Sequence, residues 1–247
     1  MGITTKDFLS KLQENKSEFK VFVPSQKKQA SARPITLKQQ KDIISTAVNG
    51  VQGSLQFLQT VNDVILENVD GDNFFTIDRV PVILGLRVHC LGTDIRVDAD
   101  TVGSLEPSLQ KIKDVPKFKY TEEVSIDNIV VKIRIPTLKE ENVVIKKCIQ
   151  EIEKLNKEDL SKTVGLVYIF ELIKHIESVS VEEDVINFNE LRVIDRIKIV
   201  ETLPLELYEK ITSFYSQTSK YDQSLLTIDD DTVIPMDASL FDAAIDA

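Results

Sequence analysis

The sequence has few of the residues that usually carry chemistry. Its 247 residues include no tryptophan, two histidines, two cysteines and two methionines. None of the eight glycines belongs to a G-x-G-x-x-G or G-x-x-x-x-G-K-[ST] motif, so the usual glycine-rich cradles for phosphate groups are missing. The two cysteines, Cys90 and Cys148, cannot form a disulfide framework and favour a reducing compartment. These absences argue against an enzyme and a bound cofactor, and they favour a scaffold or interaction protein.

The sequence also lacks a positive net charge and long apolar runs. It contains 40 Asp and Glu against 30 Lys and Arg, so its formal net charge is −10. Nucleic acid is therefore not an expected partner, because phosphate binding depends on basic clusters that release counterions. No apolar run approaches the roughly 20 residues of a membrane span, and the first residues lack a secretory signal. We expect a cytosolic protein with a sizeable core.

The beginning of the chain predicts an arm followed by a β-hairpin. Residues 1–18 are mostly polar, with a few apolar residues spaced as in a short amphipathic helix or flexible arm. The alternating residues Phe19–Val23 predict a strand that ends at Pro24. The segment Ala30–Ile35 is expected to return beside it.

Three helices are predicted after the hairpin. Thr36 and Gln39 fit a capping box, which predicts a helix from Leu37 to about Val48. Its inward side chains are expected to be Ile43, Ile44 and Ala47. The apolar spacing of Ser54–Val69 predicts an amphipathic helix. A third helix, capped by Asp78 and running from Arg79 to about His89, is apolar on so many sides that we expect it to be buried.

The middle of the chain, residues 93–138, predicts a small antiparallel β-unit inserted between two helical halves. Period-two alternation occurs in Thr93–Val97, Lys117–Ser125 and Ile129–Ile135. The polar connection at 98–116 shows little periodicity, and we interpret it as a contact loop.

Helical spacing returns in residues 139–226, which predict a C-terminal helical bundle interrupted by a strand or loop at Ser178–Phe188. The complete expectation is an α+β fold. Its parts are an arm at 1–18, a hairpin with helices at 19–92, the β-unit at 93–138, the helical domain at 139–226 and an acidic tail at 227–247.

The tail combines six aspartates and no basic residue with apolar side chains. The apolar residues of interest are Ile234, Met236, Leu240 and Phe241. Such a segment is typical of a docking peptide, which binds either a partner or its own body. We predict that these four side chains contact a partner and that the body folds without residues 227–247.

Metal and nucleophile chemistry find little support in the sequence. His89, Cys90, Cys148 and His175 include all the cysteines and histidines, but they lack the paired spacing of zinc ligands. Nothing near Cys90 activates it as a nucleophile for a pair with His175. We therefore predict no catalytic, cofactor-binding or metal-binding residue.

Acidic segments leave one rival hypothesis. Asp70–Asn73 lacks the ligand pattern of an EF-hand, and consecutive side chains of Asp229–Asp231 point in alternate directions. A metal-dependent enzyme with an unrecognised carboxylate site stays possible as an alternative, and a pocket joining Asp78 and Asp94 would support it.

A group of basic residues surrounds the predicted hairpin and first helix. Lys27, Lys28 and Lys38 belong to this group on a chain that is otherwise negative. Such a patch favours steering towards an acidic protein partner, while a merely solvated surface is the alternative.

Several short motifs, in this order, resemble those of the T4-like phage baseplate hub assembly proteins. The motifs are Val23-Pro24-Ser25-x-x-Lys28, Arg33-Pro34-Ile35-Thr36, Lys38-Gln39-Gln40-Lys41, Phe75-x-x-Asp78-Arg79, Leu84-x-Leu86-Arg87, Ile133-x-Ile135-Pro136-Thr137-Leu138 and Pro235-Met236-Asp237-Ala238-Ser239-Leu240-Phe241. The resemblance implies a non-enzymatic protein of a contractile-tailed bacteriophage that acts in assembly of the baseplate hub.

The resemblance also implies partners and a location. The partners would be other baseplate hub proteins in a hetero-oligomer, met in the host cytoplasm during assembly. The alternative is a permanent structural subunit of the virion tail baseplate. Arg79 and Arg87 lie eight residues apart on nearly the same helix face, where each can pair with carboxylates within the fold or across an interface.

Overall fold

The N-terminal hairpin forms where the alternation predicts it. A computed structural model describes residues 17–48, 50–97, 101–155, 160–229 and 232–241. Strands β1 (Phe19–Val23) and β2 (Lys28–Ala32) pair antiparallel, joined by the short helix η1 (Pro24–Gln26). The second strand ends at Ala32, before the expected Ile35, because the next amide, of Arg33, donates to the carbonyl of Asn68. The expected arm at 1–18 lies outside the described residues except for its last two.

The first helix confirms the predicted cap. Helix α2 (Leu37–Ser45) begins at Thr36, whose hydroxyl accepts the Gln39 amide at 3.2 Å while the Gln39 side chain accepts the Thr36 amide at 2.9 Å. Helix η2 (Thr46–Val48) follows it. Ile43 is buried as expected, but Ile44 and Ala47 are exposed. Neighbouring helical positions differ by about 100°, so the core contacts only part of the apolar set.

The second and third helices also form. They are α3 (Gly50–Asn68) and, after η3 (Thr76–Asp78), α4 (Arg79–Leu91). Helix α4 is buried over most of its length, as predicted. Asp78 does not cap it through its side chain. Its carboxylate instead accepts hydrogen bonds from the amides of Ser25 and Phe75, which tie η3 to the turn of the hairpin.

The strands expected in one inserted unit belong to two sheets. Strands β3 (Asp94–Arg96) and β4 (Val102–Ser104) pair with each other, and helix α5 (Glu106–Lys111) follows where a contact loop was expected. Strands β5 (Thr121–Ile126) and β6 (Ile129–Arg134) join β7 (Ile176–Val181) and β8 (Asp184–Asn187) in an antiparallel sheet of order β5-β6-β7-β8. Alternation predicts strands but does not choose their partners. The domain boundaries at 92, 138 and 226 stay a prediction.

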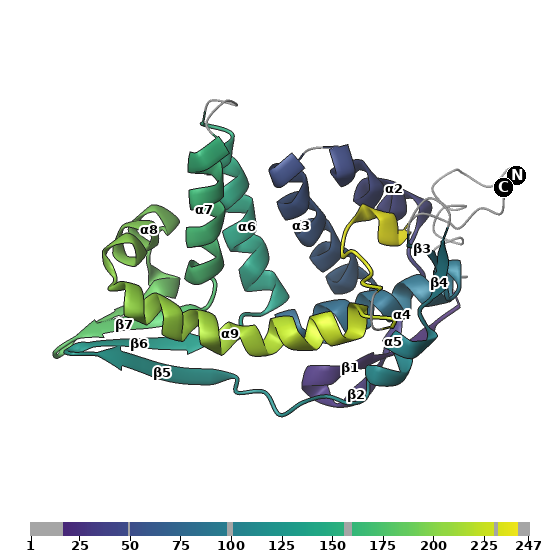
Figure 1. Ribbon diagram of the computed structural model, residues 1–247, viewed down its shortest axis with the longest axis horizontal. Helices are drawn as coiled ribbons and strands as arrows, with labels where there is room; N and C mark the ends of the chain where they lie inside the picture. Colours follow the sequence, from purple (N-terminus) through teal and green to yellow (C-terminus); the bar gives the residue numbers. More distant parts are fainter. Residues whose placement is uncertain (1–16, 49, 98–100, 156–159, 230–231, 242–247) are drawn as a thin grey trace, which may run out of the picture.

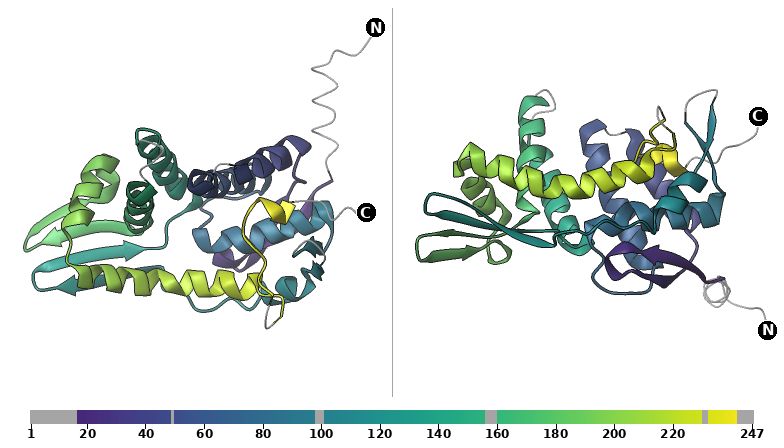
Figure 2. Two further views of the ribbon diagram at one scale, coloured as in Figure 1. Left: turned by 45° about the horizontal axis from the view of Figure 1, so that its top comes forward. Right: turned by 60° about the horizontal axis from the view of Figure 1, so that its bottom comes forward.

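The C-terminal half is helical but is not a bundle alone, since its helices pack on the four-stranded sheet. They are α6 (Leu138–Ile152), α7 (Leu160–Ile173), α8 (Val193–Thr202) and α9 (Leu205–Leu226), with η4 (Phe188–Glu190) before α8 and η5 (Ala238–Phe241) in the tail. Figures 1 and 2 place this sheet at the opposite end of the molecule from β1, β2 and the tail. The α+β class is confirmed.

Two hydrophobic cores meet along α9. One lies among the hairpin, α2, α3, α4 and the tail, and the other lies between the four-stranded sheet and α6–α9. Leu207 and Ile211 of α9 belong to the second core, whereas Tyr221 and Leu225 belong to the first. Figure 1 shows α9 running along the molecule between its two ends. Among the described residues, no helix is long and apolar enough to cross a membrane.

Candidate functional site

The tail residues predicted to contact a partner are docked on the chain itself. Ile234, Leu240 and Phe241 are buried in the first core, and Met236 is half-buried beside it. The Ile234 amide donates to the Leu226 carbonyl at 2.7 Å. Of the two alternatives, the structure therefore shows docking on the chain's own body. The aspartates at 230, 231, 242 and 246 lie outside the described residues.

Arg87 fastens this tail and does not face an interface. Its fully buried guanidinium donates to the carbonyls of Leu240 at 3.1 Å and Asp94 at 2.5 Å, and also to that of Gly92. Burial lowers the pKa of Arg87 and the charge of Asp94 raises it. Carbonyl oxygens thus take the place of the carboxylate partner that the sequence suggested for Arg87.

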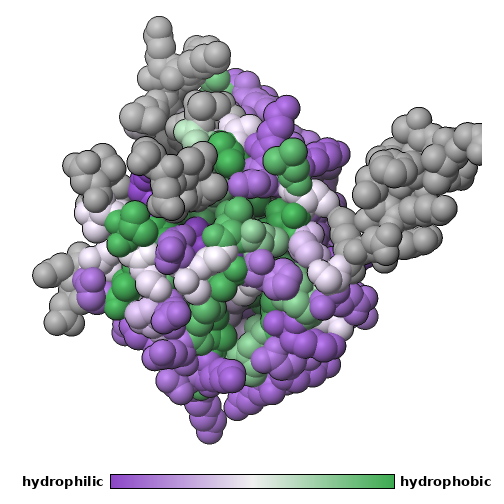
Figure 3. Space-filling view, turned by 90° about the vertical axis from the view of Figure 1, so that its right-hand side faces the viewer, coloured by the Kyte–Doolittle hydropathy of each residue, from purple (hydrophilic) through white to green (hydrophobic). Residues whose placement is uncertain are grey.

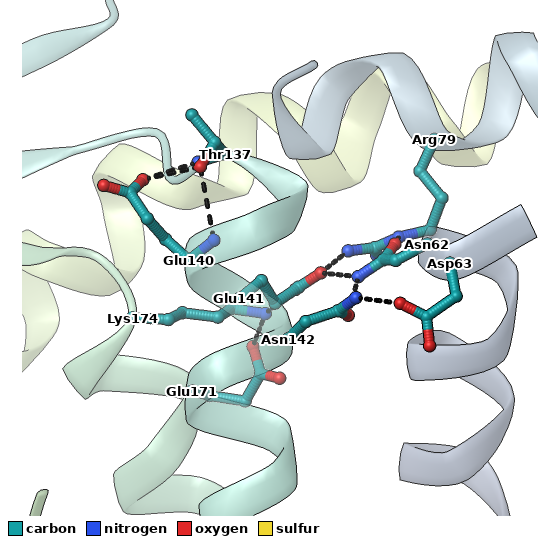
Figure 4. Close-up of polar contacts among 9 residues, drawn as sticks. All are labelled: Asn62, Asp63, Arg79, Thr137, Glu140, Glu141, Asn142, Glu171 and Lys174. Carbon is teal, nitrogen blue, oxygen red and sulfur yellow. Dashed lines mark hydrogen bonds and ion pairs between the residues drawn. The ribbon is translucent and has the colours of Figure 1, made fainter. Parts of the chain in front are cut away.

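Arg79 belongs to a buried polar junction between the two cores (Figure 4). It forms an ion pair with Glu141 of α6 and donates to the side-chain oxygen of Asn62 of α3 at 2.8 Å. Asn62 in turn donates to Glu141 at 2.9 Å. Glu141 also pairs with Lys174 at 2.9 Å. Of the two options for Arg79, the structure shows pairing within the fold instead of across an interface.

The junction includes a small cavity of about 120 Å³. Arg79, Lys174, His175 and Asp222 are among the residues that line it. One buried oxygen of Asp222 has no hydrogen-bond partner among the described residues. Burial raises the pKa of Asp222 to about 7, against the opposing effect of Arg79 and then Lys174. Burial lowers the pKa of His175 to about 3, and the charge of Lys174 adds to this effect.

The rival enzyme hypothesis gains no support from this geometry. The Asp78 carboxylate is occupied by Ser25 and Phe75, and Asp94 is exposed on β3. Within the described ranges, no group of three or more His, Cys, Asp or Glu side chains is placed to hold a metal ion. Cys148 is buried, and burial raises its pKa to about 12, so it is a poor nucleophile.

The three predicted lysines do not form a single surface. Lys27 and Lys28 lie at the closed end of the hairpin, whereas the chain leads from its open end into α2, which carries Lys38. Figure 1 shows α2 and the hairpin turn on opposite sides of the molecule. All three lysines are exposed.

Helix α2 presents an apolar surface next to Lys38. Leu37 is 82% exposed, and Ile44 is also exposed. These two residues line a depression of about 370 Å³ with Gln40, Lys41 and Ser45. Ile44 also borders a groove of about 480 Å³. The other lining residues of that groove include Phe57 and Leu58 of α3 and Met236 of the tail.

We define the α2 surface as Leu37, Lys38, Lys41 and Ile44. Figure 3 views this end of the molecule, where hydrophobic patches lie among hydrophilic ones. Sequence reasoning found Lys38, overlooked Leu37 and placed Ile44 inward. A signal for Leu37 was available, because it directly follows the cap Thr36 and its spacing from Ile43 puts the two side chains on different faces of the helix. Nothing in the local sequence marks Asn62, Glu141 or Asp222, because their partners lie on other elements.

Comparison with known proteins covers most of these features. A family model described as T4 bacteriophage base plate protein matches residues 15–225. The matched region includes the hairpin, the α2 surface, the polar junction and the four-stranded sheet, and it ends before the docked tail. No curated protein and no solved structure matches the chain. Since the family model spans well over half of the 247 residues, the chain belongs to the T4 bacteriophage base plate protein family.

Proposed function

We propose that this chain is a non-enzymatic assembly factor, which acts in formation of the baseplate hub by contacting other baseplate proteins. Its family supports the baseplate context. The observation that carries the contact role is the α2 surface, which exposes two large apolar side chains next to two lysines. We propose that it meets its partners in the host cytoplasm and forms a hetero-oligomer with them.

The α2 surface suits an acidic, apolar segment of another baseplate protein. Covering Leu37 removes apolar area from water, which is worth about 1.5–3 kcal/mol if the side chain becomes fully buried, and Ile44 adds less because it is only 37% exposed. Lys38 and Lys41 flank these side chains, so an acidic partner would be attracted before contact. An affinity built on so few side chains would be modest, as suits a contact that is made and released.

The proposed partner contact is tested by the variants Leu37→Glu and Ile44→Glu, each combined with pull-down of baseplate proteins from infected cells. Both positions are exposed, so we expect the fold to survive and the co-purified baseplate proteins to be lost. Val143→Glu, at an exposed position of α6, is the matched control. Unchanged recovery with the α2 variants would contradict a contact at this surface.

The assembly role is tested separately by quantitative mass spectrometry of purified virions and of infected-cell lysate. We expect the chain in the lysate and not in the virion. A stoichiometric amount in the virion would favour the alternative of a permanent baseplate subunit.

A further inference from the structure

The two outer strands of the four-stranded sheet have different surroundings. At the β5 side, the Gln217 amide of α9 accepts from the Lys119 backbone amide at 2.9 Å and donates to the Lys119 carbonyl at 3.0 Å. Further along, Lys210 of α9 donates to the Ser125 carbonyl at 2.7 Å. Side chains of α9 thus occupy backbone groups along this edge.

The opposite edge, strand β8, is open. All four of its residues are exposed, with Val185 62% and Ile186 45% exposed. Val181 and Asp184 close the two-residue turn between β7 and β8. Because antiparallel strands bond to a neighbour through alternate residues, the amide and carbonyl of Val185 and of Asn187 point away from β7. In the described part of the chain, no backbone hydrogen bond from another element reaches them.

Strand β8 is short and begins with Asp184, but it lacks three other features that commonly protect an edge. Natural proteins commonly place lysine, proline or a bulge on such a strand. The sequence DVIN of β8 contains neither lysine nor proline, and its register with β7 is regular. The irregularity in this sheet lies between β6 and β7, at Lys132 and Ile133. The free edge therefore retains the geometry that an added strand requires.

The charge around β8 indicates the kind of strand it would accept. Asp127, Glu182, Glu183 and Asp184 are all exposed at the turns that end the sheet. Residues 176–191 contain five acidic residues and no basic one. Among the cations near β8, Lys132 is paired with Glu177 at 2.9 Å, Arg134 with Glu140 at 2.7 Å and Arg192 with Asp195 at 2.8 Å. A second copy of β8 would bring the same acidic turn into the contact, whereas a strand with Lys or Arg would be attracted.

We propose that β8 is a docking edge, which adds an extended segment of a partner protein as a fifth strand. The segment alternates apolar side chains, which lie beside Ile186 on the sheet face that also carries Val179, with basic side chains, which lie beside Val185 on the opposite face and are attracted by the acidic turns. Main-chain hydrogen bonds to Val185 and Asn187 hold it. This inference deepens the proposed contact role and rests on it only for the biological partner.

The probe is a fluorescent ten-residue peptide that alternates lysine with valine and isoleucine, and its control carries glutamate at every lysine. Binding to the full chain is measured by anisotropy, and the docking position is measured by amide hydrogen exchange. We expect the lysine peptide to bind, the glutamate peptide not to bind, and exchange at Val185 and Asn187 to slow.

Two variants distinguish strand addition from loose charge attraction. Val185→Pro removes an amide that faces away from β7, a position where an edge strand tolerates proline, and we expect binding about tenfold weaker. Val185→Lys places a lysine, which discourages strand addition, at the same position without proline, and we expect it to weaken binding as well. Val143→Lys adds the same charge on α6 at a site that is 61% exposed, and it should leave binding almost unchanged.

Three results would overturn the docking edge: binding unaffected by either Val185 variant, equal binding of the glutamate peptide, or a chain dimer in sedimentation velocity that Val185→Pro dissolves. The last result would identify a second copy as the occupant. No other baseplate protein is present in these measurements, so they can fail while the assembly role stands, and the reverse is also true.

Discussion

The guanidinium of Arg87 donates a 3.1 Å hydrogen bond to the carbonyl of Leu240, which lies 153 residues further along the chain. The same guanidinium holds the turn that follows α4. Gln40 of α2 adds a second tie, donating to the carbonyl of Phe241 at 2.9 Å. The tail is therefore part of the first core, and it also lines the groove beside the α2 surface.

Removal of the tail side chain Phe241 should destabilise the fold. Phe241 is fully buried, so Phe241→Ala is expected to lower the free energy of unfolding by about 3–5 kcal/mol. Urea unfolding followed by circular dichroism measures this change. Val233→Ala, in the exposed part of the tail, should cost less than about 0.5 kcal/mol. Equal stability of both variants would favour the sequence-based prediction that the body folds without its tail.

Neutralising Glu141 should be far more costly than neutralising an exposed glutamate. Glu141→Gln leaves Arg79 and Lys174 buried without their shared carboxylate, and we expect a loss of about 3–5 kcal/mol in unfolding free energy. The control Glu122→Gln breaks the exposed pair with Lys119 and should cost at most about 1 kcal/mol. Chemical denaturation of the two variants makes the comparison, and similar losses would argue against the junction as a structural tie.

Asp222 should make stability fall as the pH rises. Its folded-state pKa is about 7, whereas an unfolded Asp titrates near its ordinary value of about 3.9. Between these values the folded chain keeps a proton that the unfolded chain has lost, so the stability that this proton provides is lost by about pH 7. We expect Asp222→Asn to gain stability relative to the unchanged chain from pH 4 to pH 7.

Comparing the Asp222→Asn variant with the unchanged protein also cancels the effect of His175 on stability, which has the opposite dependence on pH. The pKa of His175 is about 3 in the folded state, and an unfolded His titrates near about 6.5, so its contribution to stability rises with pH over that interval. It is common to both chains and cancels in their difference. Unfolding free energies at pH 4.5, 6 and 8 supply the data, and parallel curves for the two chains would contradict the assignment to Asp222.

Charge reversal should act differently on helix α2 and at the hairpin turn. Lys38→Glu with Lys41→Glu is expected to slow association with an acidic baseplate partner at low salt, because both lysines belong to the α2 surface. Lys27→Glu with Lys28→Glu makes the same change in net charge at the hairpin turn and should slow it less. Stopped-flow rates at two salt concentrations test this, and equal slowing would point to net charge alone.

Local features of this fold were predictable from the sequence, and its distant pairings were not. The capping box at Thr36 and the buried character of α4 depend on residues within a few positions of one another. The pairing of β6 with β7 joins residues about 45 positions apart, such as Lys132 and Ser178, and alternation is the same whichever neighbour a strand has. For the same reason, the sequence left open whether the tail docks on a partner or on its own body, and it did not identify Glu141 as the partner of Arg79.

The docked tail affects the order in which the chain can fold during synthesis. The hydrogen bond from the Gln40 side chain can form only after Phe241, 201 residues later in the sequence, has been synthesised. Domains generally fold as they leave the ribosome, starting from the N-terminal side. Here the β1–β2 hairpin and α2 emerge early, but their core is complete only after the whole second half has been translated. The apolar residues of the first core that Leu240 and Phe241 cover therefore stay exposed on the nascent chain until these two residues have been synthesised.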